Sequence, residues 1–375
     1  MINKERLQNS FLEMVRIPSP SRKEGAFAKY LQDQLSQLGF QIKIDQKSMA
    51  PTGSDTGNII AFLPGKLENA PSIMFSAHMD TVTPCEVINP VVNSDRISTD
   101  GTSILGADDK AGIAAIIEAV RHLQEEGIAH VPIEMVITTC EEKGLLGSRH
   151  LDYSLLKSRF GYVLDGGGEP GVIINRGPAQ DQFTATIKGR AAHAGINPEE
   201  GISAIQVAAK AIAKMKLLRI DEETTSNIGY ISGGGATNIV TESVKLKGEA
   251  RSLCNEKLAA QTAHIHDCLL RTCQEYEAEL IWQLSREYDA FEIAEDSPGV
   301  QLAIEGAKSI GLKPRIIPSG GGSDVNYFNT QGLETINLGT GMSKVHTTDE
   351  YILIEDLTNL AGLVAAIIQQ YTMQM

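Results

Sequence analysis

A histidine and an aspartate, His78 and Asp80, stand two residues apart at the end of an apolar run, residues 73–75. The run predicts a buried strand. Side chains two residues apart on a strand point to the same side. The strand would therefore deliver an imidazole and a carboxylate together to its C-terminal edge, which is where ligands bind in an open α/β sheet.

Other acidic residues and a second histidine stand at or just after predicted strands, or at a predicted helix start. With the first pair they form the set His78, Asp80, Asp108, Glu141, Glu142, Asp165 and His346. Imidazoles and carboxylates without thiolates suit Zn²⁺, Co²⁺ or Mn²⁺. Seven such residues exceed one site, and a carboxylate shared by two ions about 3.5–4 Å apart would use them economically.

Each of these residues, taken alone, has an ordinary structural explanation. Asp108 and its neighbour Asp109 would be favourable acids at a helix N-terminus. Residues 141–142 could form a solvated turn, and Asp165 before three glycines could form another. The joint placement favours a site, because independent surface acids would not all follow apolar strands.

Composition bounds the class of protein. The length of 375 residues suggests two domains, with one large domain as the alternative, and a hydrophobic fraction of 42% is enough for a core. A net charge of −14 argues against nucleic-acid partners and anionic membranes. Five cysteines without a pairing pattern, a charged N-terminal segment and the lack of a run of ~18 apolar residues predict a cytoplasmic protein without a transmembrane helix.

Strands and helices alternate up to residue 177 and again from residue 290, which predicts a doubly wound α/β sheet. Between these parts the order is β-α-β-β-α-β, the split unit of a ferredoxin-like α+β domain. We therefore expect a discontinuous catalytic domain, residues 1–177 and 290–375, with an inserted domain of residues 178–289. Within the catalytic domain we expect a long loop over residues 81–107 and a helix with Ser21 as its N-cap.

Five motifs, taken in order, resemble those of peptidase T and its co-catalytic di-zinc exopeptidase relatives. They are SAHMDT (76–81), GADDK (106–110), CEEKG (140–144), DGGG (165–168) and His346 four residues before Glu350. The resemblance covers nearly the whole chain, including the inserted domain. It implies a zinc-exopeptidase-type mixed sheet and two divalent metal ions, Zn²⁺ above all, with Co²⁺ or Mn²⁺ as alternatives.

The resemblance also implies a role for each site residue. The metal ligands would be Asp108 as the bridge, His78 and Asp165 for one ion, and Glu142 and His346 for the other. Glu141 would be the general base and then the acid for a water activated by the two ions. Asp80 would hydrogen-bond His78 and fix its tautomer.

Further residues resemble the family's substrate-binding groups. These are His193, Arg251, Asn238, Gly321 and Gly322. His193 matches a histidine that supplies an oxyanion donor, and Arg251 matches an arginine that binds the substrate's carboxylate. The glycines match a loop whose amides can approach a peptide closely.

These observations predict a metal-dependent exopeptidase that releases the N-terminal residue of short peptides, tripeptides in particular. The inserted domain would act as a lid or as the contact in a homodimer. The segment between Asp80 and residues 100–102 is shorter than in peptidase T, so strict tripeptide specificity is not carried over. The alternatives are an amidohydrolase or carboxypeptidase acting on N-acyl or C-terminal amino acids, and a peptide-binding protein without turnover. An intact Glu141 argues against the last, because binding alone needs no base.

Overall fold

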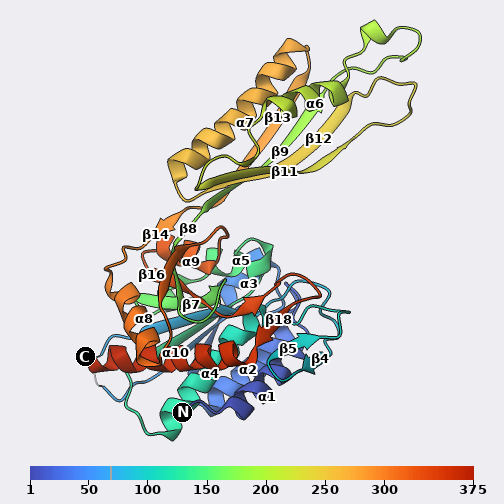
Figure 1. Ribbon diagram of the computed structural model, residues 1–375. Helices are drawn as coiled ribbons and strands as arrows, with labels where there is room; N and C mark the ends of the chain where they lie inside the picture. The colour runs from blue at the N-terminus through green and yellow to red at the C-terminus, as the bar shows by residue number, and fades with distance from the viewer. Residues whose placement is uncertain (68–69) are drawn as a thin grey trace. The chain divides into compact units, whose positions relative to one another are not determined.

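The computed structural model describes residues 1–67 and 70–375, and the chain divides into two compact units (Figure 1). Unit 1 comprises Met1–Arg176, Glu292–Ser319 and Ser323–Met375. Unit 2 comprises Gly177–Phe291 together with Gly320–Gly322. The functional roles predicted for the two domains, catalysis for one and lid or dimer contact for the other, stay predictions.

A nine-stranded mixed sheet forms the centre of unit 1. Its path is β1 (Gln41–Asp45), β2 (Asn58–Leu63), β6 (Ile133–Thr138), β3 (Ile73–His78), β7 (Phe160–Gly166), β16 (Glu334–Gly339), β8 (Val172–Gly177) and β14 (Phe291–Glu292), with β15 (Arg315–Pro318) paired to β8. The pairs from β6 through β3 and β7 to β16 are parallel, whereas β1–β2, β2–β6 and β16–β8 are antiparallel. Every residue of β3 and β6 is buried, as expected of central parallel strands covered on both faces.

Helices cover both faces of this sheet. They are α1 (Lys4–Val15), α2 (Gly25–Gln37), α3 (Gln46–Thr52), α4 (Ala107–Glu125), α5 (Leu146–Arg149), α8 (Pro298–Ser309), α9 (Asp324–Thr330) and α10 (Ile354–Met373), with a short 3₁₀ turn at Tyr153–Leu155. Helix α4 packs on β3, β7, α1 and α10, while α5 packs on α3 and α9. Figure 1 shows these two groups on opposite sides of the sheet, which confirms the doubly wound α/β class. No helix within the described residues is both long and apolar enough to cross a bilayer.

Unit 2 has its own sheet and core. Its elements are β9 (Ala179–Lys188), a 3₁₀ turn (Pro198–Glu200), α6 (Ala204–Lys214), β10 (Leu218–Arg219), β11 (Thr224–Gly233), β12 (Ser243–Ser252), α7 (Asn255–Glu275) and β13 (Glu279–Tyr288). The strands pair antiparallel in the order β10-β11-β12-β9-β13. Alternate residues of β9 (Phe183, Ala185 and Ile187) are buried in one cluster with residues of α6 and α7. Apart from the short β10, this is the predicted ferredoxin-like arrangement.

Two local predictions in unit 1 are wrong. The segment 81–107 contains β4 (Pro90–Val92) and β5 (Arg96–Thr99), which join β18 (Tyr351–Leu353) and β17 (Met342–Ser343) in a small sheet. Strands β4 and β5 pair with each other as a short hairpin, and β5 also pairs with β18, about 250 residues later in the chain. Ser21 does not cap a helix either, because α2 follows Glu24 and the Ser21 hydroxyl donates to the Asp80 carboxylate at 2.6 Å.

Candidate metal centre

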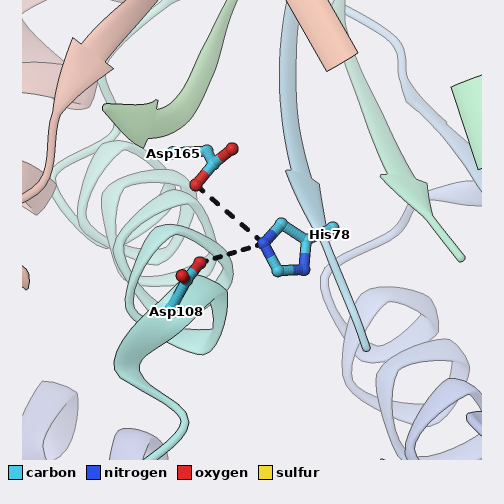
Figure 2. A group of neighbouring side chains, drawn as sticks. All are labelled: His78, Asp108 and Asp165. Atoms are coloured by element: carbon cyan, nitrogen blue, oxygen red, sulfur yellow. Dashed lines mark hydrogen bonds and ion pairs between the residues drawn. The ribbon is translucent and has the colours of Figure 1, made fainter. Parts of the chain in front are cut away.

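Three predicted ligands meet at the C-terminal edge of the parallel strands. His78 is the last residue of β3, Asp165 lies near the end of the neighbouring β7, and Asp108 lies at the start of α4. The His78 Nε2 is 3.0 Å from Asp108 Oδ1 and 3.9 Å from Asp165 Oδ1. Figure 2 shows one ring nitrogen of His78 facing both carboxylates, so a cation placed there would meet all three side chains.

Close packing of α4 against β7 brings two of these residues together. A Cβ on Gly112, in the first turns of α4, would lie 2.6 Å from the main-chain oxygen of Leu164. No real Cβ tolerates that distance, so glycine is what allows the helix to approach the strand here. Leu164 directly precedes Asp165, and this close contact therefore brings the beginning of α4 near Asp165.

A second group shares Asp108 with the first. It consists of Asp108, Glu142 and His346, whose ligand atoms lie within 4.8 Å of one another. The His346 Nε2 is 3.2 Å from Asp108 Oδ2 and 2.9 Å from Glu142 Oε1. The two oxygens of Asp108 thus face different imidazoles, Oδ1 towards His78 and Oδ2 towards His346. A carboxylate that bridges two cations needs this arrangement.

Glu141 lies beside both groups. It opens a 3₁₀ turn, Glu141–Lys143, that follows β6, and its side chain is buried. Its carboxylate lies within 4.8 Å of ligand atoms of His78 and Glu142. Distance alone lets Glu141 serve either as a ligand or as a base, and the two roles differ in what its removal does to metal content.

His78 is oriented by a main-chain oxygen. Its Nδ1 is 2.9 Å from the carbonyl oxygen of Asp80, whereas the Asp80 carboxylate lies 3.6 Å away, beyond hydrogen-bond distance. The expected contact between the two residues is therefore made chiefly by the backbone. A carbonyl oxygen only accepts, so Nδ1 carries the proton, and Nε2 faces Asp108 as a ligand atom would.

The Asp80 carboxylate instead organises the turn that carries the two glutamates. Its Oδ1 accepts the Glu141 amide at 2.9 Å, and its Oδ2 accepts the Glu142 amide at 3.3 Å. The Ser21 hydroxyl donates to the same Oδ2. Asp80 therefore connects the strand that carries His78 to the turn that follows β6.

Glu350 also belongs to the site, although the sequence analysis assigned it no role. Its buried carboxylate accepts the amides of Leu105, Gly106 and Asp108 at 2.7, 2.8 and 3.1 Å. Burial raises the pKa of this carboxyl to about 7. Glu350 fixes the chain that leads into Asp108, and the only available signal was its position four residues after His346.

Electrostatics at the site favour a bound cation. Burial raises the pKa of Asp165 well above its ordinary value, and Asp108 adds to the shift. Burial also raises the pKa of Glu141, and His78 opposes that rise only in part. The close carboxylates of Asp108 and Glu142, at 3.2 and 2.9 Å, raise the pKa of His346 to about 10. Carboxylates that repel one another in a buried site hold protons or attract cations, and a divalent ion would supply the missing positive charge.

The donor atoms fit divalent metal ions. Two ligand atoms at about 2.0–2.1 Å from a tetrahedral Zn²⁺ lie roughly 3.3 Å apart, close to the Asp108–histidine distances of 3.0 and 3.2 Å. Glu142 Oε1 is buried and makes no hydrogen bond of acceptable geometry within the described part of the chain, although His346 Nε2 is 2.9 Å away. Such an oxygen suits a metal ligand better than a structural acceptor.

A comparison with protein families matches most of the chain. The profile of peptidase family M20/M25/M40 matches residues 74–370. The chain belongs to this family. The matched region contains the five predicted metal ligands, Glu141 and Asp80, and it also contains unit 2.

Individual relatives of this M20 family chain are similar over their full lengths. An uncharacterized protein, YqjE of Bacillus subtilis (strain 168), is 43% identical over 370 residues, covering 99% of both chains. The crystal structure of aminopeptidase PepT from Bacillus cereus ATCC 10987 is 44% identical, with a TM-score of 0.93 and 99% coverage of both chains. The structure of a tripeptidase from Staphylococcus aureus subsp. aureus Mu50 is 40% identical, with a TM-score of 0.97 and 100% coverage of both chains.

The predicted oxyanion and carboxylate-binding residues lie in unit 2 of this M20 chain. His193 is exposed and close to Asn238, since the amide of Ala194 donates to the main-chain oxygen of Asn238 at 2.9 Å. Arg251 lies in β12, and its Nε donates to Glu249 Oε1 at 3.0 Å. Substrate binding by these residues stays a prediction, as does a homodimer formed through unit 2.

The predicted glycine loop is held by close packing. Gly321 and Gly322 belong to unit 2 by their contacts. A Cβ on Gly322 would come within 2.2 Å of the Tyr288 ring, so glycine is required at that position. Its predicted contact with peptide substrate stays a prediction.

Proposed function

We propose that this M20 family chain is a di-metal aminopeptidase that hydrolyses short peptides, tripeptides among them. The observation that carries the proposal is the Asp108 carboxylate between His78 and His346, with Glu141 alongside. The similarity to an aminopeptidase and to a tripeptidase, at 44% and 40% identity over essentially complete chains, supports the substrate class.

The ligand assignment follows the two groups of side chains. His78 and Asp165 would hold one ion, Glu142 and His346 the other, and Asp108 both. When bound, the two ions, Zn²⁺ in the first place, supply Lewis acidity that polarises the scissile carbonyl and makes a water molecule more acidic. Asp80 and Glu350 accept main-chain amides and would hold the ligand-bearing segments in place.

The proton transfers belong to Glu141 in this proposal. Its carboxylate takes a proton from the attacking water and returns it to the nitrogen of the leaving amine. A base that later acts as an acid works best with a pKa near the working pH, and burial shifts the pKa of Glu141 upward from its ordinary value. In this proposal, His193 of unit 2 donates a hydrogen bond to the developing oxyanion.

The choice between an aminopeptidase and the acyl-amino-acid alternatives depends on the free α-amine. We expect N-acetylation of a good tripeptide substrate to abolish most of its cleavage, because an aminopeptidase recognises that amine. Mass spectrometry of the products should show release of the N-terminal residue. The control is the unacetylated tripeptide under the same conditions, so that both peptides keep the C-terminal carboxylate that Arg251 is predicted to bind. Cleavage of the acetylated peptide at an undiminished rate would favour the amidohydrolase or carboxypeptidase alternative.

The role of His193 can be measured separately. We expect His193→Ala to lower kcat by roughly 10²–10³, the usual loss for one oxyanion donor, with unchanged metal content. His266→Ala is a matched control in unit 2, because His266 lies on α7, where its ring contacts Trp282 edge-on. Normal kcat in His193→Ala, measured beside this control, would remove His193 from the mechanism.

A further inference from the structure

The main-chain amides of four consecutive residues, 139–142, all donate hydrogen bonds to side chains from other parts of the chain. This segment includes Glu141, the proposed base. Thr139 donates to Asn58 Oδ1 at 3.0 Å, Cys140 to Glu24 Oε1 at 3.0 Å, Glu141 to Asp80 Oδ1 at 2.9 Å and Glu142 to Asp80 Oδ2 at 3.3 Å. The conformation of residues 139–142 is therefore set by long-range partners. Of the three partners only Asp80 has been given a role above, and Glu24 is the buried carboxylate of the remaining two.

Glu24 is fully buried, and hydrogen bonds occupy both of its carboxylate oxygens. Oε1 accepts the Cys140 amide and lies 3.2 Å from the Cys140 Sγ, while Oε2 accepts the Ser54 hydroxyl at 2.6 Å. A buried carboxylate is costly unless it is hydrogen-bonded in this way. Glu24 directly precedes α2, although its side chain makes no capping bond to that helix. Its hydrogen bonds go instead to Cys140, in the turn after β6, and to Ser54.

The turn after β6 needs a hydrogen-bond partner at Cys140 because the backbone there has an unfavourable conformation. Cys140 has φ +51°, in the left-handed region that non-glycine residues rarely adopt. Such a conformation persists only where the surroundings hold it. If Cys140 relaxed to a right-handed or extended conformation, the chain after it would leave in another direction. Glu141 and Glu142 would then point away from His78 and His346.

We propose that Glu24 is a positioning residue that holds the left-handed turn at Cys140 and thereby aims Glu141 and Glu142 at the metal centre. The expected effect on catalysis rests on the proposed function, whereas the effect on the turn does not. The contact that matters is the hydrogen bond to the Cys140 amide. Glutamine can keep that bond through its carbonyl oxygen and can donate its amide to the Ser54 hydroxyl, whereas alanine can do neither.

The experiment compares Glu24→Ala and Glu24→Gln with a control of the same kind elsewhere in unit 1. Glu134 is also a buried carboxylate that accepts main-chain amides, those of Lys157 and Ser158, and it lies near the other end of β6. Glu134→Ala thus removes an equivalent brace at a distance from the centre. We expect Glu24→Ala to lower kcat roughly 10- to 100-fold, the usual effect of losing a residue that orients a ligand. KM should change little, and Glu24→Gln and Glu134→Ala should stay near the wild-type kcat.

Amide hydrogen exchange gives a readout that does not depend on turnover. Exchange in a peptide spanning residues 139–142 should accelerate in Glu24→Ala and stay slow in Glu24→Gln and Glu134→Ala. Wild-type kcat in Glu24→Ala would overturn the proposal, and so would equal losses in the alanine and glutamine variants, since these would point to charge. If Glu24→Ala does not fold, Glu24→Asp, one methylene shorter, takes its place under the same criteria. An inactive wild-type protein with the expected exchange pattern would refute the proposed function and leave the positioning role intact.

Discussion

Asp108→Ala should lose bound metal and peptidase activity together. Asp108 is the residue common to both ligand groups, and each of its oxygens faces a different imidazole, at 3.0 and 3.2 Å. Without it, each ion would lose a ligand and the negative charge that the two ions share would disappear. Activity should fall by several orders of magnitude. Elemental analysis after dialysis should find well under the two ions per chain expected of a bridged centre.

Asp109→Asn is the matched control for this experiment. Asp109 is the next residue, is fully buried, and accepts the His78 amide through Oδ2 at 3.3 Å. Burial, with help from Asp165, raises the pKa of Asp109 well above its ordinary value, so a neutral amide is a mild replacement. This variant should keep its metal. If Asp108→Ala retained two ions per chain while remaining folded, the bridging assignment would be wrong.

The sequence predicted that the candidate ligand side chains come together because their placement depends on local patterns. His78 and Asp165 end apolar strands that are parallel neighbours, and parallel strands end at one edge of a sheet. Asp108 opens a strongly apolar helix that must pack on those strands. In each case a short run of residues predicts the strand or helix. The topology of α/β sheets then predicts that the ends of these elements lie close together.

The residues that hold this centre could not be found in the same way. Glu350 accepts amides about 245 residues earlier in the chain, and Glu24 accepts one 116 residues later. Each is a single polar residue with no periodic pattern around it, and its partner is a main-chain amide that carries no sequence signal. Ser21 illustrates the point, because its type and position suit an N-cap, yet the folded chain brings Asp80 within reach of its hydroxyl.

Glu141→Gln and Glu142→Gln should fail in different ways although the two residues are adjacent. Glu141→Gln should keep its metal and lose roughly 10²–10⁴ in kcat, the range for removal of a general acid–base group. Glu142→Gln should chiefly weaken binding of the ion held with His346, because Glu142 Oε1 lies 2.9 Å from that imidazole and is otherwise without a hydrogen bond in the described residues. Metal titration and steady-state kinetics on the same preparations separate the two effects.

The comparison between these variants also tests whether Glu141 is itself a ligand. Its carboxylate forms a third close group with His78 and Glu142, so geometry alone admits that role. A ligand replaced by glutamine loses its charge and part of its affinity for the metal, whereas a base replaced by glutamine loses only its proton chemistry. Equal metal loss in the two variants would make Glu141 a ligand, and the proton transfers would then need another group. Full metal content with a collapsed kcat in Glu141→Gln alone would leave Glu141 as the base.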